Sequence, residues 1–308
     1  MARRNSKLPA VGANSSSNQP LTHVANANRS HRPARGLQYP NHGTMDAPFI
    51  VIGATGTIGS AVVRELVESG SPVVAVAPRP ERLSQLGEGS RPGAVIPLAG
   101  CIETEADAER LADQLRALAR PIAGVIVAFP HGRSADATTE RRRLIDQPTT
   151  ALSDCLWQTV LAQHALARHL IPMLAEAGRN ARYLIVGGPG SETPWAGYGH
   201  RSIAMAATRM LARVLHDEAR PAGVRVQLVS IDSPMRSEQP RAHECPEWPT
   251  ASDVARRVMR LLDRDATDEP ADAVIACTRG GIAGSVRRWS RTFSDVPSFL
   301  ESLRNSSK

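Results

Sequence analysis

Short apolar runs alternate with amphipathic stretches along most of the chain, starting near residue 48. The first run, PFIVIGA, covers residues 48–54 and has the β-branched residues typical of a buried strand. The next stretch, GSAVVRELVES, covers residues 59–69. Its apolar residues Val62, Val63 and Leu66 fall on one helical face. This opening therefore predicts a strand followed by a helix.

The same strand-then-helix unit repeats toward the carboxyl terminus. Further strands are predicted at residues 71–77, 93–99, 123–129, 181–188, 223–231 and 271–277. Helices are predicted at residues 80–86, 105–119, 151–177, 199–220 and 251–265. Strands that alternate with helices predict an α/β fold, a Rossmann-type doubly wound parallel sheet of about seven strands with helices on both faces.

The segment at residues 233–250 is rich in proline and has no clear period. It follows the sixth predicted strand, and ligands in such sheets bind beyond the carboxyl ends of the strands. The segment is therefore expected either to cover a site or to be a surface loop.

The first 44 residues differ from the rest in charge and composition. They contain no acid and account for six units of the formal net charge of +7. The basic residues are Arg3, Arg4, Lys7, Arg29, Arg32 and Arg35. Few apolar clusters occur here, which predicts a disordered basic tail at residues 1–44 ahead of one folded domain at residues 45–308. Because that domain is close to neutral, its charge does not support a basic nucleic-acid surface, and no nucleic-acid partner is expected.

Two explanations of the tail remain open. An acid-free start rich in Arg and Ser is typical of an organellar transit segment. Alternatively, the start codon is assigned too early, because Met45 opens MDAPFIVIGATG directly before the first predicted strand. The pair Arg3 and Arg4 is not followed by an apolar region, which argues against secretion.

Cysteine usage and hydropathy bear on the compartment. Cys101, Cys155, Cys245 and Cys277 are widely spaced and form no CxxC pair, so neither a disulfide framework nor a zinc site is indicated. No apolar run approaches the ~20 residues needed to span a bilayer. The sequence therefore predicts a cytoplasmic protein with no metal centre and no membrane partner.

A glycine-rich turn, GATGTIG, joins the first predicted strand to the first predicted helix. Its glycines are spaced three apart, which permits a tight turn, close approach of backbone N–H groups to a pyrophosphate, and close packing of helix on strand. At the start of a βαβ unit this spacing predicts dinucleotide binding. The predicted cofactor-binding residues of the turn are Gly53, Thr55, Gly56, Thr57, Ile58 and Gly59.

The end of the second predicted strand bears on which dinucleotide binds. A protein that selects NAD usually has an acid there, which binds the ribose 2′-hydroxyl. This chain reads VAVAPRPER instead, with Arg79 and Arg82 where a 2′-phosphate would lie. Although surface arginines are common, this position favours NADP(H) over NAD(H).

The order of these features resembles that of the short-chain dehydrogenase/reductase family over about residues 48–281. The motifs that carry the resemblance are GATGTIG, ARHLIPML, YLIVGG and the segment YGHRSIAMAATRMLARVLHDEARPAGVRVQLVSIDSP, which begins at Tyr198. The run ADAVIACTRGG is similar to the family's last strand and glycine pair. The glycine spacing is similar to that of the family's extended and atypical branches, whereas the carboxyl-terminal half is similar to its main branch.

The resemblance implies a catalytic tetrad, of which this chain keeps one member. In the family a Tyr transfers the proton of the substrate oxygen, and a Lys four residues later lowers the tyrosine pKa and holds the ribose. A Ser steadies the substrate, and an Asn completes a proton relay. Tyr198 matches the Tyr, but Ser202 stands at the Lys position. Gly188 stands most nearly at the Ser position and Thr159 at the Asn position, so the member is divergent.

The missing lysine leaves a need for positive charge. Lys7 and Lys308 are the only lysines, so the predicted domain has no internal replacement. A phenol with the ordinary pKa of about 10 is a poor base at neutral pH unless a cation lies nearby. Arg201 precedes the Lys position by one residue and is the candidate for that cation. The predicted catalytic residues are therefore Tyr198, Arg201 and Ser202.

Three further polar residues are weaker candidates. Ser191 or Thr193 is a candidate for the missing serine, and His131, in FPHG after the fourth predicted strand, is a candidate proton donor. Each also fits the description of an ordinary polar loop residue. Trp195, Trp248 and Met235 indicate either an apolar substrate pocket or ordinary packing.

Three functions follow from these features. The first is an NADPH-preferring oxidoreductase that acts on a carbonyl or alcohol group of a small molecule, and the retained Tyr198 favours it. The second is a non-catalytic NADP-binding sensor or scaffold protein, which the lost lysine favours. An isomerase or epimerase is the third. The resemblance also implies a homodimer or homotetramer, built on the helices predicted at residues 151–177 and 199–220.

Overall fold

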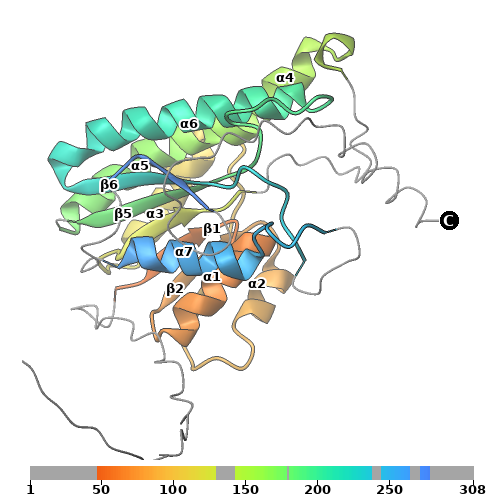
Figure 1. Ribbon diagram of the computed structural model, residues 1–308. Helices are drawn as coiled ribbons and strands as arrows, with labels where there is room; N and C mark the ends of the chain where they lie inside the picture. The colour runs from red at the N-terminus through yellow and green to blue at the C-terminus, as the bar shows by residue number, and fades with distance from the viewer. Residues whose placement is uncertain (1–46, 130–142, 179, 238–243, 264–270, 278–308) are drawn as a thin grey trace, which may run out of the picture. The chain divides into compact units, whose positions relative to one another are not determined.

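The computed structural model describes residues 47–129, 143–178, 180–237, 244–263 and 271–277 (Figure 1). Every described residue belongs to one compact unit that begins at Tyr39. The predicted tail, residues 1–44, lies outside the described residues, and so does His131.

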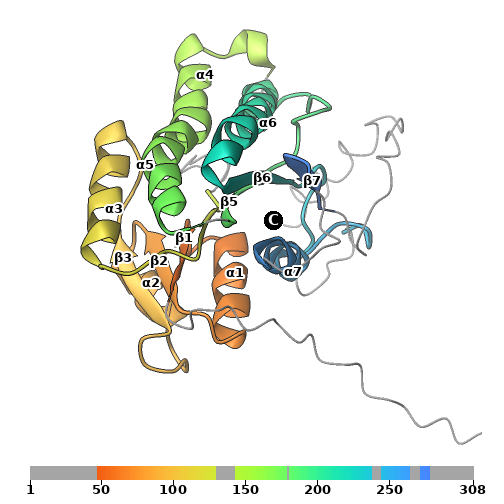
Figure 2. The same cartoon turned by 90° about the vertical axis from the view of Figure 1, so that its left-hand side faces the viewer.

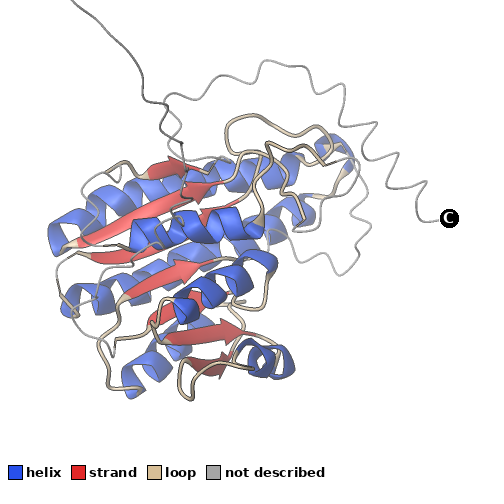
Figure 3. Cartoon of the chain, turned by 60° about the horizontal axis from the view of Figure 1, so that its bottom comes forward, coloured by secondary structure: helices blue, strands red, loops and turns tan. Residues whose placement is uncertain are grey.

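A seven-stranded parallel sheet forms the centre of the described unit, and Figure 3 shows its strands in red among the helices. The strands are β1 (Phe49–Ile52), β2 (Val73–Ala77), β3 (Val95–Ala99), β4 (Gly124–Val127), β5 (Ala181–Gly187), β6 (Val224–Ser230) and β7 (Val274–Ala276). Their order across the sheet is β3-β2-β1-β4-β5-β6-β7, and each neighbouring pair is parallel. The predicted Rossmann-type fold is confirmed.

Helices cover both faces of the sheet. They are α1 (Thr57–Glu68), α2 (Pro80–Leu86), α3 (Glu105–Ala117), α4 (Thr149–Leu156), α5 (Ala162–Glu176), α6 (Gly199–Ala219) and α7 (Ala251–Leu262). Figure 2 shows α1, α2 and α7 on one face, with α3, α5 and α6 on the other. Two short 3₁₀ turns, Leu144–Asp146 and Arg220–Ala222, were not predicted.

The two faces of the sheet bury separate apolar clusters. In β1, Phe49 and Val51 pack with α1 and α7, whereas Ile50 and Ile52 pack with the helices of the other face. Successive side chains of a strand point to opposite faces, so a strand covered on both sides is apolar throughout. This explains why the unbroken apolar runs of the sequence were correctly predicted as strands.

The helix predicted at residues 151–177 contains an irregular turn. Trp157–Leu161 form a π-helical turn between α4 and α5, in which the Ala162 N–H donates to the Trp157 carbonyl. Such a turn inserts one residue into the helical repeat. Apolar periodicity could predict the helix but not this local change.

The order of the strands defines where a ligand can enter. The chain runs outward from β1 to β2 and β3, and then returns to place β4 on the other side of β1. In open α/β sheets this reversal separates the loops that follow the two neighbouring strands and leaves a crevice at their carboxyl ends. The glycine-rich turn follows β1 and therefore lies at this crevice.

Candidate functional site

The glycine-rich turn has a backbone that other residues could not adopt. Gly53 has a φ of +82°, in the left-handed region, and a Cβ on it would lie 2.2 Å from the Ala128 carbonyl oxygen. A Cβ on Gly59 would lie 2.1 Å from the Gly53 carbonyl oxygen. These contacts seat the start of α1 directly against the ends of β1 and β4. The roles predicted for the first and last glycines agree with this geometry.

The entrance of α1 presents unpaired backbone donors. The first N–H groups of a helix lack carbonyl partners within the helix. At α3 and α7, Thr104 and Thr250 accept from such N–H groups in capping boxes, whereas Gly56 at the N-cap of α1 has no side chain. The N–H groups of Thr57, Ile58 and Gly59 therefore suit an anion such as a pyrophosphate.

The two predicted cofactor arginines lie beyond the end of β2. Arg79 is the N-cap residue of α2, Arg82 lies within α2, and both are exposed. Among the described residues neither guanidinium forms an ion pair. An open hollow of about 290 Å³ lies at the same edge of the sheet, lined by residues that include Val76 and Cys101. Both arginines are thus free to bind a phosphate group.

Tyr198 and Arg201 are brought together at the start of α6. Tyr198 is the N-cap residue of this helix, and its backbone N–H donates to the Trp195 carbonyl at 2.9 Å. The Arg201 Cζ lies over the Tyr198 ring, 5.7 Å from its centroid. This is a cation–π contact, in which the charge lies against the ring face. The Trp195 ring meets the Tyr198 ring edge-on, with 6.3 Å between centroids.

Ser202, at the predicted lysine position, holds a loop in place. Its side chain is buried, and its Oγ accepts the Trp195 N–H at 3.0 Å. The loop also passes over Ser202 at Gly190, where a Cβ would lie 2.8 Å from the Ser202 Oγ. The space that a lysine needs is thus occupied by the loop between β5 and α6. A catalytic role of Ser202 stays a prediction, whereas its contact with the loop is explicit.

The candidates for the other tetrad positions differ in how they are placed. Thr159 is buried in the π-helical turn and donates to the Cys155 carbonyl. The Gly188 N–H donates to the Met205 sulfur at 3.3 Å. Thr193 is exposed in the loop between β5 and α6. The hydroxyl of Thr159 is therefore committed to the helix backbone.

A network around Arg209 was not predicted from the sequence. Arg209 donates to Ser191 Oγ at 3.3 Å and to Ser230 Oγ at 3.4 Å, and it forms an ion pair with Glu192. The Asp232 carboxylate accepts from both Ser191 and Ser230. The network ties the loop after β5 to the end of β6 and engages Ser191. Its one signal in the sequence is an arginine on an otherwise apolar stretch of helix.

Burial sets the protonation of two groups beside Tyr198. Burial and the neighbouring Arg201 guanidinium lower the pKa of His200, so its imidazole is neutral near pH 7. Burial raises the pKa of the Cys155 thiol, although Arg201 and a hydrogen bond with Thr159 oppose the rise. Cys155 is therefore a thiol at neutral pH and no nucleophile. Arg201 remains the cation of this region.

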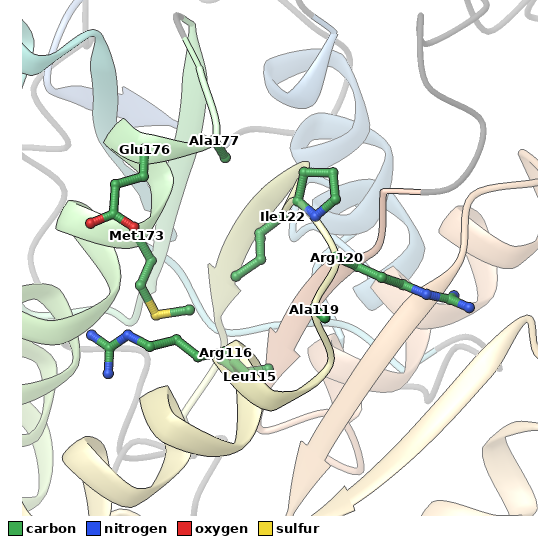
Figure 4. Close-up of a pocket in the computed structure, with 9 residues that line it drawn as sticks. Leu115, Arg116, Ala119, Arg120, Ile122, Met173, Glu176 and Ala177 are labelled. Atoms are coloured by element: carbon green, nitrogen blue, oxygen red, sulfur yellow. The ribbon is translucent and has the colours of Figure 1, made fainter.

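A second open hollow, of about 320 Å³, lies at the opposite edge of the sheet. Figure 4 shows its lining, which comes from the ends of α3 and α5 and from the segment before β4, and includes Arg116, Ile122 and Met173. This edge holds the amino end of β4, far from the glycine-rich turn. The hollow is thus separate from the candidate site.

No described helix is both long and apolar enough to cross a membrane. The described residues also contain no group of three or more His, Cys, Asp or Glu side chains placed to hold a metal ion.

Comparison with known proteins relates this geometry to a family. A family model described as short chain dehydrogenase matches residues 48–242. A short chain dehydrogenase from Mycobacterium smegmatis is 18% identical, with a TM-score of 0.62, and the match covers 80% of this chain and 95% of that chain. No curated protein matches the chain.

A second solved structure is similar in fold. It is the NADPH-bound structure of a short chain oxidoreductase from Pseudomonas aeruginosa PAO1 that contains an atypical catalytic center. Its identity is 18% and its TM-score 0.64, and the match covers 78% of this chain and 99% of that chain.

Proposed function

The chain belongs to the short-chain dehydrogenase/reductase family, and we propose from this premise that it is an NADPH-preferring oxidoreductase acting on a carbonyl or alcohol group of a small molecule. Family members bind NAD(P)(H). The observation that carries the proposal is the entrance of α1, where Gly53 and Gly59 press the turn against the sheet and the first N–H groups lack acceptors. That entrance lies at the strand-order reversal, where this fold class binds dinucleotides.

The cofactor would be held by the chain's own backbone and arginines. The N–H groups of Thr57, Ile58 and Gly59 would bind the pyrophosphate, and Arg79, with Arg82, would bind the 2′-phosphate of NADP(H). When bound, the nicotinamide supplies or accepts a hydride. The preference for NADPH rests on two exposed arginines and on the lack of an acid at the end of β2.

Tyr198 is the proposed acid or base. Its hydroxyl would donate a proton to the substrate oxygen in reduction and accept one in oxidation. Arg201 would favour the phenolate, because its positive charge lies over the ring. Trp195, packed edge-on against Tyr198, would provide an apolar wall that limits the access of water. In this arrangement Arg201 would supply the positive charge that the family's lysine supplies from the next position in the helix, which Ser202 occupies here.

The experiment that tests this function begins with titration of the protein by NADPH and NADH. A panel of ketones and aldehydes is then assayed with the cofactor that binds more tightly, using the parent protein and Tyr198→Phe. Retained cofactor affinity with turnover lowered by about 10² to 10⁴ supports an enzyme with Tyr198 as acid or base. Equal turnover in both proteins contradicts this role of Tyr198.

A second function is favoured by one observation. Ser202 occupies the lysine position and is committed to the loop at Trp195 and Gly190. A protein that kept its dinucleotide site but lost the relay would be a non-catalytic NADP-binding sensor or scaffold. Tight NADPH binding without turnover across the whole panel would identify this alternative.

A homo-oligomer, dimer or tetramer, is also proposed. Large apolar side chains are exposed on the helices that were predicted to form the interface. They are Trp157, Leu161, Ile203, Met210 and Val214. Exposed apolar patches commonly mark contacts between proteins. Sedimentation as a monomer at micromolar concentration would contradict the proposal.

Two further proposals concern the cellular context. Four free cysteines support a reducing compartment such as the cytoplasm, where disulfides are rare. Residues 1–44 are proposed to be dispensable for folding, because their composition offers no core. Their deletion should leave the thermal midpoint within a few degrees of the parent's.

A further inference from the structure

Arg236 lies in the segment that follows β6, at the edge of the sheet where the candidate site lies. Its backbone N–H donates to the Pro249 carbonyl at 2.9 Å, which fixes it beside Thr250, the N-cap of α7. The preceding residue, Met235, packs against the apolar cluster that includes Ala54 of the glycine-rich turn. Arg236 is therefore anchored between the start of α7 and the region of that turn.

The side chain of Arg236 has a buried donor without an acceptor. Its Nε is shielded from solvent, and none of the hydrogen bonds or ion pairs of the described residues involves its guanidinium. In two other buried or partly buried arginines, part of the guanidinium is paired. The Arg182 Nε donates to the Leu261 carbonyl at 3.1 Å, and Arg209 forms an ion pair with Glu192. A buried donor left unpaired is unfavourable, so Arg236 indicates an acceptor that the chain itself does not supply.

The acids near Arg236 are engaged elsewhere. The Asp232 carboxylate accepts from Ser191 and Ser230, and the Glu244 carboxylate accepts from Ser237. The Asp253 carboxylate accepts from Thr250 and pairs with Arg256. Among the described residues, none of these carboxylates forms an ion pair with Arg236. An added anion would supply the acceptor that the Arg236 Nε lacks.

The position of α1 indicates which anion this is. α1 and α7 pack against each other on one face of the sheet (Figure 2). Because α1 follows β1 and α7 follows β6 in a parallel sheet, both helices begin at its carboxyl edge. The entrance of α7 is capped by Thr250, whereas the N–H groups at the entrance of α1 lack acceptors. An anion at the entrance of α1 would therefore bind at the same edge of the sheet as Arg236, which lies beside the entrance of the neighbouring helix α7.

We propose that Arg236 binds the pyrophosphate of the dinucleotide, opposite the N–H groups of Thr57 and Ile58. The inference rests on the proposed function, since it requires that a dinucleotide binds at the glycine-rich turn. Charge-assisted hydrogen bonds to phosphate are the strong ones, and arginine can make two of them at once. The pyrophosphate is common to NADH and NADPH, whereas the 2′-phosphate assigned to Arg79 is present in NADPH alone.

This difference gives a test that does not depend on turnover. Dissociation constants for NADH, NADPH and adenosine 2′-monophosphate are measured by fluorescence or calorimetry on the parent, Arg236→Gln and Arg79→Gln. Arg236→Gln should weaken NADH and NADPH by a similar factor of about tenfold, and leave adenosine 2′-monophosphate unchanged because it has no pyrophosphate. Arg79→Gln should weaken NADPH and adenosine 2′-monophosphate but not NADH.

Controls separate binding from folding. Arg213→Gln, on the exposed side of α6, is the matched charge removal and should bind all three ligands like the parent. The thermal midpoint of Arg236→Gln without ligand should equal that of the parent. Arg236→Lys keeps the charge and should recover much of the lost affinity for both dinucleotides. If Arg236→Gln does not fold, Arg236→Lys is measured in its place. A loss of affinity that is similar for NADH and NADPH, and smaller than tenfold, would then support the inference.

Each contrary result has a distinct meaning. If Arg236→Gln binds NADH and NADPH as the parent does, the inference is overturned while the proposed function stands. Loss of NADPH affinity alone would assign Arg236 to the 2′-phosphate and also overturn it. Unchanged cofactor affinity with a raised KM for an acidic substrate would place a substrate carboxylate there instead. If the parent binds neither dinucleotide, the proposed function and this inference fail together.

Discussion

Replacing Ser202 by lysine restores the family's residue in the sequence, but we expect it to damage the structure. Ser202 is 6% exposed, its Oγ accepts the Trp195 N–H at 3.0 Å, and Gly190 packs directly on it. Ser202→Ala removes only the acceptor and should lower the free energy of unfolding by about 1 kcal/mol. Ser202→Lys adds a long chain where the loop lies, so the expected loss is roughly 2 to 4 kcal/mol.

The assay is urea unfolding with linear extrapolation, together with turnover under saturating NADPH. Ala117→Lys places the same side chain at the exposed end of α3, away from the proposed oligomer surface, and should change the free energy of unfolding by less than about 0.5 kcal/mol. Ser202→Lys should be the less stable of the two and should not gain turnover. If Ser202→Lys were as stable as Ala117→Lys and more active than the parent, the loop would have moved to admit the lysine, and the steric reasoning would be wrong.

Three other results are expected. Gly59→Ala should lower the free energy of unfolding by about 3 kcal/mol in urea, because its Cβ would lie 2.1 Å from the Gly53 carbonyl oxygen. Gly87→Ala, with 3.7 Å to the nearest atom, is the matched control and should be close to neutral. Arg182→Met removes a buried donor to the end of α7 and should cost about 2 kcal/mol, so parent-like stability would contradict that role. The pKa of His200 is lowered from 6.5, so the unfolded chain binds its proton more readily and the free energy of unfolding should fall as pH drops below about 6.5. His200→Asn should make that fall shallower between about pH 7 and 5 in urea unfolding, and an unchanged slope would exclude His200 as its source.

The sequence predicted the sheet well because the central strands β1, β2 and β4 are buried throughout and their residues are all apolar or glycine. It could not reveal the π-helical turn at Trp157–Leu161, since an inserted residue shifts the helical period by less than the scatter of apolar positions. In the candidate site, residues 53–59 act through one local turn, and their proximity follows from spacing alone. Tyr198 and Arg201 are likewise one helical turn apart.

The parts that escaped prediction depend on contacts between distant segments. The role of Ser202 as a support for Gly190 and Trp195 depends on how the loop after β5 folds back over α6. Arg209 joins the ends of two strands, and Arg236 is identified by the lack of a partner in three dimensions. The residue types in the sequence reveal neither a contact between distant segments nor a buried donor that lacks an acceptor.

The packing of α7 against α1 also has a consequence for synthesis on the ribosome. These two helices share one apolar cluster, although α1 is among the first helices made and α7 the last one described. At about 5 to 20 residues per second, α1 waits on the order of 10 to 40 s before its partner emerges. During that interval its apolar side has no cover from α7 and is available to chaperones or to other nascent chains. In a polypeptide truncated before residue 251, the apolar side of α1 would never be covered by α7. Such fragments should therefore aggregate even though they contain the whole glycine-rich turn.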